Sequence, residues 1–464
     1  MPAYVKLLPA LVAAVVLALT GTASAALKVD WMRGAASPGT PAQYDKVGVI
    51  KVGSARARNV LVLEPGTSAG SAYFVPLARW ITSTARGWQV WSVERRENLL
   101  EDQSVLQRGK DGRASMTQVF DYYLGYIADH SITHHFQTIP GSRVAFAKRW
   151  GMSVAVGDLH RVIRAARKLG GKVVLGGHSL GGSVVTAYAS WNFAGRPGAA
   201  QLGGLVYIDG GSFRSAETAP AARATLAALN APSASPWLTF GGIQAPLAGI
   251  FSATGSTAAV VDPKARSVGQ RSGLLTPFGL TPAVPLSNLA QYGYALNVGT
   301  SPAPLIAAQA HLGRGISATG AVRGWDGRGA LTPITRFARM FSGTGVKGAD
   351  GTEWYFPQRL TDDTAAIANG TANPAQKVLG LKATMGDRLP RRLRIYAFGA
   401  ALGGQVILNA ARQLAAQSHI PLGNVTLVNR HRTYAHNDPN GAYPKNAFFA
   451  HLIPFLGKVA AARG

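Results

Sequence analysis

The stretch that most constrains the fold of this 464-residue chain is KVVLGGHSLGGS, residues 172–183. Its first part, Val173–Leu175, is a short apolar, β-branched run of the kind that forms a buried strand. The run ends in the glycine-rich turn GGHSLGG, and residues 183–194 then have the apolar spacing of a helix. A strand, a tight turn and a helix in this order predict an α/β arrangement with Ser179 on the turn.

The turn contains the pattern G-x-S-x-G from Gly177 to Gly181. Between a strand and a helix this pattern is typical of a nucleophile elbow, a strained turn that presents a serine hydroxyl above the edge of a sheet. Glycine is needed on both sides because the backbones approach too closely for a Cβ atom. The following helix adds the positive end of its dipole. The alternative is an ordinary glycine-rich connection between a strand and a helix.

Composition restricts the classes of protein that remain. A hydrophobic fraction of 47% with 15% charged residues is that of a globular protein and excludes a disordered one. The length fits two or three average domains, or one α/β domain with an insertion. The sequence has no cysteine, which excludes disulfides, cysteine nucleophiles and thiolate metal sites.

The N-terminus has the three parts of a secretory signal peptide. Lys6 is the only charged residue in 1–25, Leu7–Leu19 is apolar, and Ala23-Ser24-Ala25 forms an A-x-A cleavage signal. An apolar core of about 13 residues is too short for a comfortable membrane span. We therefore expect an exported, secreted protein without a stable membrane span, and an uncleaved anchor is the alternative.

The net charge of +26 would suit an anionic cell surface, lipid headgroups or nucleic acid. Lys and Arg are scattered, however, with no basic stripe interleaved with aromatic residues and no nucleic-acid motif. The sequence therefore predicts no nucleic-acid partner and leaves electrostatic association with an anionic cell envelope open.

Strand and helix patterns alternate along the chain, which predicts a mostly parallel sheet with helices on both faces. The expected strands are Asp45–Val52, Val60–Leu63, Gln89–Val93, the elbow strand, Leu205–Ile208, Leu393–Phe398 and Val425–Val428. The expected helices outside the elbow and insertion are Tyr73–Ala85, Ser153–Leu169, Gln405–Ala416 and Asn446–Ala460.

Between these two halves, residues 212–388 are rich in Ala, Gly, Pro, Ser and Thr, with helical pieces and no evident strand. A stretch of this length is too long for a loop, so we expect a mainly helical or irregular cap insertion. The expected organisation is a signal peptide (1–25), a first core part (26–211), the cap (212–388) and a second core part (389–464).

Residues 45–210 and 390–460 together resemble the α/β-hydrolase superfamily, and GHSLGG is similar to the elbow of its secreted esterases and lipases. The resemblance implies a catalytic Ser, acid and His in that chain order, with the His after the last strand. It also implies an oxyanion hole of backbone N–H groups.

Three histidines follow the last expected strand. His436 lies in the turn-rich loop YAHNDPNG, which suits a side chain aimed over the elbow. His431 directly abuts the strand end, and His451 sits in an apolar helix where a packed role is expected. We therefore assign His436 as the base.

The superfamily commonly carries the acid after the strand that precedes the final helix–strand pair, but residues 399–404 contain no carboxylate. No Asp or Glu occurs between Asp387 and Asp438. Asp209 closes the strand after the elbow helix, at the edge where catalytic groups gather in open α/β sheets, and some superfamily members use this position. We assign Asp209, with Asp387 in reserve at the wrong end of its strand.

One oxyanion donor is expected from the N–H of Leu180, directly after the nucleophile. Matching Pro65-Gly66-Thr67 to the HG-x pattern of the superfamily indicates the N–H of Thr67 as the second donor, and Ser68 is equally suitable. Pro65 stands where many relatives have His, and the HGGG pattern of one lipase subgroup is absent.

Other clusters carry less weight. Asp129-His130 with His134-His135 has helical spacing that could bind zinc, but no motif supports a metal and we expect none. His178 is expected to pack away from Ser179. The acids between Glu94 and Asp102 are expected to form ion pairs with Arg95 and Arg96 at the sheet edge, or a subsite for a cationic substrate group.

The predicted protein is thus a secreted serine hydrolase that cleaves a small-molecule or lipid carboxylic ester without a cofactor. Ser179, His436 and Asp209 would form the triad, and Thr67 and Leu180 the oxyanion hole. The alternatives are a peptidase or amidase, an acyltransferase, and a non-catalytic envelope-binding protein on a hydrolase scaffold.

Overall fold

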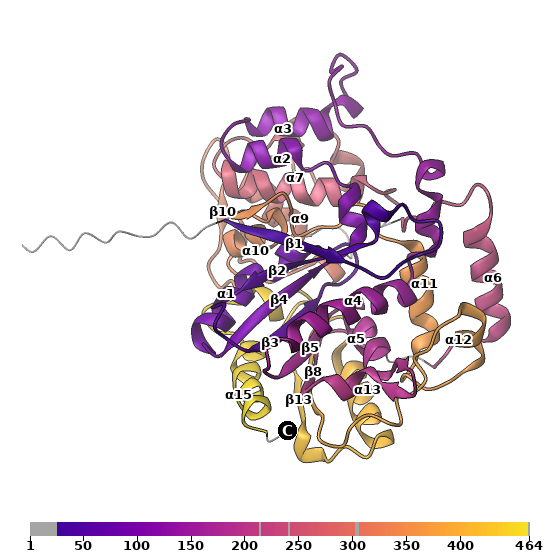
Figure 1. The fold of residues 1–464 in the computed structure, drawn as a ribbon. Coiled ribbons are helices and arrows are strands. Elements are labelled where there is room, and N and C mark those ends of the chain that lie inside the picture. The colour runs from indigo at the N-terminus through magenta and orange to yellow at the C-terminus, as the bar shows by residue number, and fades with distance from the viewer. Residues whose placement is uncertain (1–25, 213–214, 240–241, 302–305, 463–464) are drawn as a thin grey trace, which may run out of the picture.

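A computed structural model describes residues 26–212, 215–239, 242–301 and 306–462. A nine-stranded twisted sheet forms the centre, and helices cover both of its faces (Figure 1). The predicted signal peptide, residues 1–25, lies outside the described residues.

The strands follow the order β11-β1-β2-β4-β3-β5-β8-β12-β13 across the sheet. In chain order they are β1 (Leu27–Arg33), β2 (Lys46–Val52), β3 (Asn59–Glu64), β4 (Trp88–Glu94), β5 (Val173–His178), β8 (Gly204–Ile208), β11 (Val346–Lys347), β12 (Arg394–Gly399) and β13 (Val425–Asn429). Strand β2 runs antiparallel to its neighbours β1 and β4. The six adjacent strands β4-β3-β5-β8-β12-β13 run parallel to one another. This order, with the elbow strand β5 in the middle, is the α/β-hydrolase fold, and the predicted fold class is confirmed.

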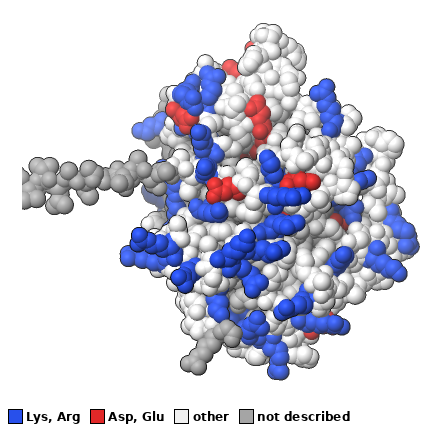
Figure 2. All heavy atoms as spheres, viewed as in Figure 1, with Lys and Arg blue, Asp and Glu red and all other residues white. Residues whose placement is uncertain are grey.

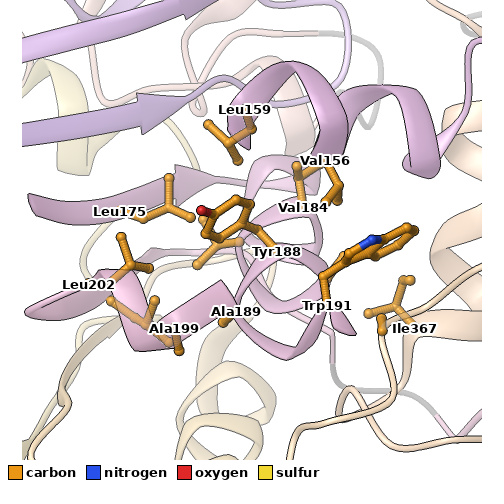
Figure 3. Close-up of a cluster of buried hydrophobic side chains, with 14 of the residues drawn as sticks. Val156, Leu159, Leu175, Val184, Tyr188, Ala189, Trp191, Ala199, Leu202 and Ile367 are labelled. Carbon is orange, nitrogen blue, oxygen red and sulfur yellow. The ribbon is translucent and has the colours of Figure 1, made fainter. Parts of the chain in front are cut away.

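One face of the sheet is covered by α4 (Met152–Arg167), α5 (Leu180–Ser190) and α13 (Gly404–Gln417). Leu175 of β5 and Val184 of α5 are completely buried there, and Tyr188 lies among their neighbours (Figure 3). Helix α4 ends before Gly170, whose φ of 79° makes it the glycine stop that the sequence predicts. This packing anchors the strand and the helix that flank Ser179.

The opposite face is covered by α1 (Val75–Thr84), α15 (Ala447–Ala461) and α10 (Ile334–Ser342). Phe448 of α15 stacks on Tyr396 of β12, with ring centroids 5.4 Å apart. Both faces thus bury a continuous apolar layer, as expected of a mainly parallel sheet.

The segment 212–388 is mainly helical but is not separate from the core. Its two-residue strand β11 pairs with β1 at the edge of the sheet, and α10 packs on the α1 face. Helix α11 (Gln358–Ile367) instead packs on α4 and α5, so the segment reaches both faces. Its description as a cap stays a prediction.

The remaining α-helices and strands of this segment are α6 (Ala219–Asn230), α7 (Leu247–Val261), α8 (Val268–Arg271), α9 (Asn288–Leu296), α12 (Pro374–Leu379), β9 (Gly315–Ile316) and β10 (Trp325–Asp326). Outside it lie α2 (Ser104–Lys110), α3 (Met116–Tyr123), α14 (Asp438–Gly441) and the hairpin of β6 (Asn192–Phe193) and β7 (Arg196–Pro197). Helices α2, α3 and α7 share a third apolar cluster that contains Trp150, Trp237 and Trp354.

Lys and Arg side chains are spread over the whole face seen in Figure 2, with few acidic side chains between them. Among the described residues, no helix combines the length and the apolar composition needed to cross a bilayer.

Candidate active site

Ser179 lies on the sharp turn between β5 and α5. Its φ of 55° and ψ of −128° are strained for a residue with a side chain, as a nucleophile elbow requires. Two glycines allow neighbouring backbones to approach it. A Cβ atom at Gly66 would lie 2.7 Å from Ser179 Cβ, and one at Gly210 would collide with the Ser179 carbonyl group. The loop after β3 and the end of β8 therefore both meet at Ser179.

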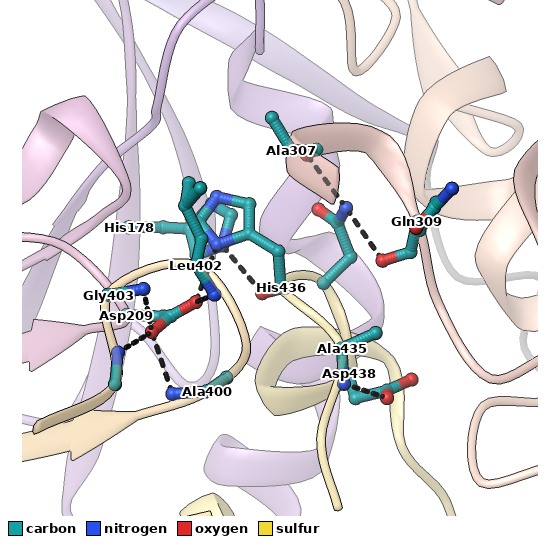
Figure 4. A network of polar contacts seen from close by, with 12 residues as sticks. His178, Asp209, Ala307, Gln309, Ala400, Leu402, Gly403, Ala435, His436 and Asp438 are labelled. Atoms are coloured by element: carbon teal, nitrogen blue, oxygen red, sulfur yellow. Dashed lines mark hydrogen bonds and ion pairs between the residues drawn. The ribbon is translucent and has the colours of Figure 1, made fainter. Parts of the chain in front are cut away.

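Asp209 is the first residue after β8, and its carboxylate is enclosed by the loop that follows β12. The N–H groups of Ala400 and Gly403 donate to its Oδ1 at 2.7 and 2.9 Å, and that of Leu402 donates to Oδ2 at 3.1 Å (Figure 4). Burial alone would raise the pKa of Asp209, but the hydrogen bond from His436 and these backbone donors together lower it. Asp209 is thus held as a carboxylate.

His436 lies on the loop after β13, and its Nδ1 is 2.7 Å from Asp209 Oδ2. Because a carboxylate only accepts, Nδ1 carries the proton and Nε2 is left as the acceptor nitrogen. The His436 side chain is 1% exposed, whereas Ser179 is only half-buried. Ser179 Oγ makes no hydrogen bond within the described residues. Catalytic hydrogen bonds of this kind are often long without substrate.

His178 supports the other side of His436. Its Nε2 lies 3.0 Å from the carbonyl oxygen of His436, and the two rings are 4.3 Å apart (Figure 4). The ring of Tyr73 stacks on the ring of His178, with centroids 5.3 Å apart. Burial, together with the nearby His436, lowers the pKa of His178 to about 3, so it is a neutral ring whose Nε2–H donates. Sequence reasoning predicted a packed His178 but not that it holds the His436 backbone.

The proposed oxyanion donors lie on two elements that meet at Ser179. Leu180 opens α5, and Thr67 and Ser68 lie in the turn after β3. None of these three N–H groups makes a hydrogen bond within the described residues. All three are therefore free to bind a ligand oxygen, and their positions alone do not choose between Thr67 and Ser68.

Arg95 and Arg96 are buried directly after β4, and of the ion pairs predicted within the acid cluster, the one between Arg95 and Glu97 forms, at 3.5 Å. Arg95 pairs with Glu64 and Glu353, and Arg96 pairs with Asp45 and Asp158. The missed signal is that two of these acids, Glu64 and Asp158, lie within core elements, where a charge needs a buried partner.

The acids between Glu94 and Asp102 are occupied inside the protein. Glu94 accepts from the N–H of Ser71 at 2.6 Å, and Glu97 lies 3.5 Å from Arg95. Glu101 accepts from the N–H of Trp354 at 2.7 Å. These contacts occupy Glu94, Glu97 and Glu101, three of the carboxylates that a subsite for a cationic substrate group would use.

The other candidate residues have different partners. His431 bonds to Asn429, His451 to the carbonyl of Ala447, and Asp387 lies 3.9 Å from Arg388 on the surface. His135 stacks on Tyr126 at 3.9 Å and His134 lies beside Tyr122. Within the described ranges, no group of three or more His, Cys, Asp or Glu side chains is arranged to hold a metal ion.

A second His–Asp pair lies close by and was not predicted. His311 Nδ1 is 2.6 Å from Asp438 Oδ2, and Asp438 is two residues beyond His436. The backbone carbonyl groups of Ala307 and Gln309 also accept from the side chain of Asn437 (Figure 4). The segment 307–311 is therefore bonded to the loop that carries His436.

Comparison with known proteins gives only distant likenesses. No protein-family model matches the chain, and no curated protein matches its sequence. Among solved structures, a putative lipase from Sulfolobus solfataricus is similar at 14% identity over 93% of each chain, with a TM-score of 0.47. A thioesterase domain from the curacin biosynthetic pathway is 12% identical, covers 93% of this chain and 99% of that one, and has a TM-score of 0.41. A soluble variant of monoglyceride lipase from Saccharomyces cerevisiae is 10% identical, covers 95% and 98%, and has a TM-score of 0.40.

The protein has the α/β-hydrolase fold, and this assignment rests on its strand order and its elbow. At these identities and TM-scores, nothing about activity follows from the likenesses.

Proposed function

We propose that this protein is a serine hydrolase that cleaves carboxylic esters, with Ser179 as nucleophile, His436 as general base and Asp209 as the group that orients it. The observation that carries the proposal is the hydrogen bond of 2.7 Å between Asp209 and His436 beside a strained serine turn. A serine hydroxyl needs an adjacent base, and the base needs a fixed tautomer.

In the proposed reaction, Nε2 of His436 takes the Ser179 proton while Oγ attacks the ester carbonyl carbon. Backbone N–H groups at the elbow bind the oxygen that becomes negative. The imidazolium then gives its proton to the departing alcohol, leaving an acyl group on Ser179. A water molecule, deprotonated by the same ring, attacks the acyl-enzyme and releases the carboxylic acid. No step needs a cofactor.

The test is covalent labelling of the purified protein with a fluorophosphonate, which phosphonylates activated serines. We expect stoichiometric labelling of the wild type and none of Ser179→Ala. Ser183→Ala is the matched control, because Ser183 lies one turn further along α5 and donates to the Gly211 carbonyl at 3.2 Å. A wild type that takes up no probe, or a Ser179→Ala variant that is still labelled, would contradict the proposal.

Activity on p-nitrophenyl esters of increasing acyl length, compared with aminoacyl anilides, separates ester from amide cleavage. The acids from Glu94 to Glu101 are occupied by protein partners, so no observation supports their binding a peptide amino terminus. Acyl transfer would appear as a new ester formed only when an alcohol acceptor is added.

We also propose that the protein is exported and that its substrate is a small-molecule or lipid ester. The proposal of export depends on the sequence of residues 1–25 and predicts a mature N-terminus after Ala25, which N-terminal sequencing tests. The net charge of +26 supports a salt-sensitive association with an anionic cell envelope, measurable as binding to anionic vesicles that salt abolishes.

A further inference from the structure

One buried side chain, that of Arg95, donates hydrogen bonds to the backbone of the turn after β3. Arg95 follows β4 directly, and its Nη1 donates to the carbonyl oxygen of Pro65 at 3.0 Å. Its Nη2 donates to the carbonyl oxygens of Gly66 at 2.7 Å and Ala69 at 3.2 Å. A single guanidinium therefore contacts three carbonyl groups of a turn that lies against Ser179.

The direction of these bonds determines where the N–H groups of the turn point. In a trans peptide, the carbonyl of one residue and the N–H of the next point in opposite directions. Because the Gly66 carbonyl points at Arg95, the N–H of Thr67 points away from Arg95. Gly66 itself touches Ser179, since a Cβ placed on it would lie 3.4 Å from Ser179 Oγ. Arg95 thus fixes the orientation of the Thr67 N–H at the elbow.

Ser68 has no equivalent constraint on its N–H. The orientation of that N–H depends on the carbonyl of Thr67, which accepts no hydrogen bond within the described residues. The carbonyl of Ser68 accepts from the Glu353 N–H at 3.0 Å. This bond orients the peptide between Ser68 and Ala69, and the N–H of Ala69 donates to the Gly66 carbonyl. Of the two candidate donors, Thr67 is the one that is preorganised.

Carboxylates hold the guanidinium itself in place. Glu64 Oε1 accepts from Nη1 at 2.8 Å, and Glu353 Oε2 accepts from Nη2 at 2.6 Å and from Nε at 3.1 Å. The arginine is 5% exposed, and its Cζ lies over the ring of Phe356, 5.3 Å from the centroid. A charged donor also polarises the peptide it binds, which strengthens the N–H at the other end of that peptide.

We propose that Arg95 is the positioning residue of the oxyanion hole: it grips the Gly66 carbonyl so that the N–H of Thr67, and not that of Ser68, joins the N–H of Leu180 in binding the oxyanion. This inference rests on the proposed function. It assigns Arg95 no contact with substrate, since its donors are directed at the turn and at carboxylates.

Arg96 provides a matched control because it is the next residue, is equally buried and is also paired with carboxylates. Its guanidinium contacts Asp158 at 2.6 Å, Asp45 at 2.7 Å and the Ala35 carbonyl at 2.7 Å, none of them in the turn after β3. A lysine at either position keeps the charge but loses the planar fork of donors. Arg95→Lys and Arg96→Lys should therefore destabilise the fold to a similar degree and differ in catalysis.

The experiment compares kcat and KM for a p-nitrophenyl ester in both variants and the wild type. Removing one oxyanion donor lowers kcat by about 100- to 1,000-fold in known cases. For a misaligned donor we expect kcat of Arg95→Lys to fall about 10- to 100-fold, with KM within about threefold. Arg96→Lys should keep kcat within about threefold. Equal kcat values in the two folded variants, or a change confined to KM, would overturn the inference.

A crystal structure of the wild type phosphonylated on Ser179 tests the same inference without a variant, and decides it if Arg95→Lys does not fold. We expect the phosphonyl oxygen within hydrogen-bond distance of the Thr67 and Leu180 nitrogens, with Arg95 still on the Gly66 carbonyl. An oxygen bound by the Ser68 N–H would overturn the inference and leave the proposed function intact. Failure of the wild type to be phosphonylated would instead overturn the proposed function.

Discussion

The part of the chain that the structure describes contains two His–Asp pairs with nearly equal hydrogen bonds and very different surroundings. His436 and Asp209 are 2.7 Å apart, and His311 and Asp438 are 2.6 Å apart. In the first pair both side chains are buried, at 1% and 0% exposure. In the second, Asp438 is buried but the His311 side chain is 40% exposed.

The carboxylates differ in what else they bind. Asp209 accepts hydrogen bonds from N–H groups of the turn that follows β12. Gly210, the residue after Asp209, lies against the backbone of Ser179. Asp438 accepts from the Thr332 hydroxyl and from the N–H of Ala435, so it ties residues 311 and 332 to the loop of His436. The comparison teaches that nearly equal His–Asp distances occur in different settings. The elements that the carboxylate joins separate the pair beside Ser179, which we propose to be catalytic, from the pair that connects loops.

The largest difference is expected when each histidine is replaced in the same way. His436→Gln removes the proposed general base, and loss of a triad member lowers kcat by about 10⁴-fold or more. His311→Gln should leave kcat within about tenfold, because it changes a connection and no reacting group. Both are measured as kcat on a p-nitrophenyl ester. If His311→Gln lost as much activity as His436→Gln, the assignment of the two pairs would be wrong.

Replacing the two aspartates should give a smaller difference in kcat than replacing the two histidines. Asp209→Asn places an amide NH₂ among backbone donors and favours the wrong imidazole tautomer, so we expect kcat to fall by about 10³- to 10⁴-fold. Asp438→Asn removes a charged acceptor from a buried site, which should cost about 1–3 kcal/mol of unfolding free energy. Its effect on kcat should stay near tenfold. Denaturant unfolding and kcat are measured for both variants. An Asp438→Asn variant as inactive as Asp209→Asn would contradict the assignment of Asp209 to the proposed catalytic pair and of Asp438 to a connection between loops.

The first of these pairs was accessible from the sequence because each member has a local signal. Asp209 ends a strand next to Gly210-Gly211, and His436 lies in a loop of turn residues after the last strand. Residues 399–404 contain no carboxylate of their own, and the N–H groups of Ala400 and Gly403 in this turn bind the carboxylate of Asp209 instead. The donors are backbone atoms, which no residue pattern identifies.

What the sequence could not reveal depends on contacts between distant parts of the chain. Arg95 bonds to Glu353 across 258 residues, and His311 to Asp438 across 127. Strand β1 was missed although Leu27, Val29 and Trp31 occupy alternate positions, which is the pattern of a half-buried strand. Strand β11 has two residues, too few for any periodic pattern, and is stabilised by pairing with β1.

The smallest predicted effect concerns the pH dependence of the exposed pair. The hydrogen bond to Asp438 raises the pKa of His311 above its ordinary value of 6.5, although partial burial opposes the shift. A histidine whose pKa is higher in the folded state contributes stability below its unfolded pKa and loses it as pH rises through the folded pKa. The unfolding midpoint of the wild type should therefore exceed that of His311→Gln most at about pH 5.5, and the difference should shrink above about pH 6.5.

Burial raises the pKa values of Glu64 and Glu94 to about 7, so they titrate over the same range. Their contribution is common to both proteins and cancels in the difference. A difference that stays constant or grows with pH would show that charge on His311 does not strengthen the pair.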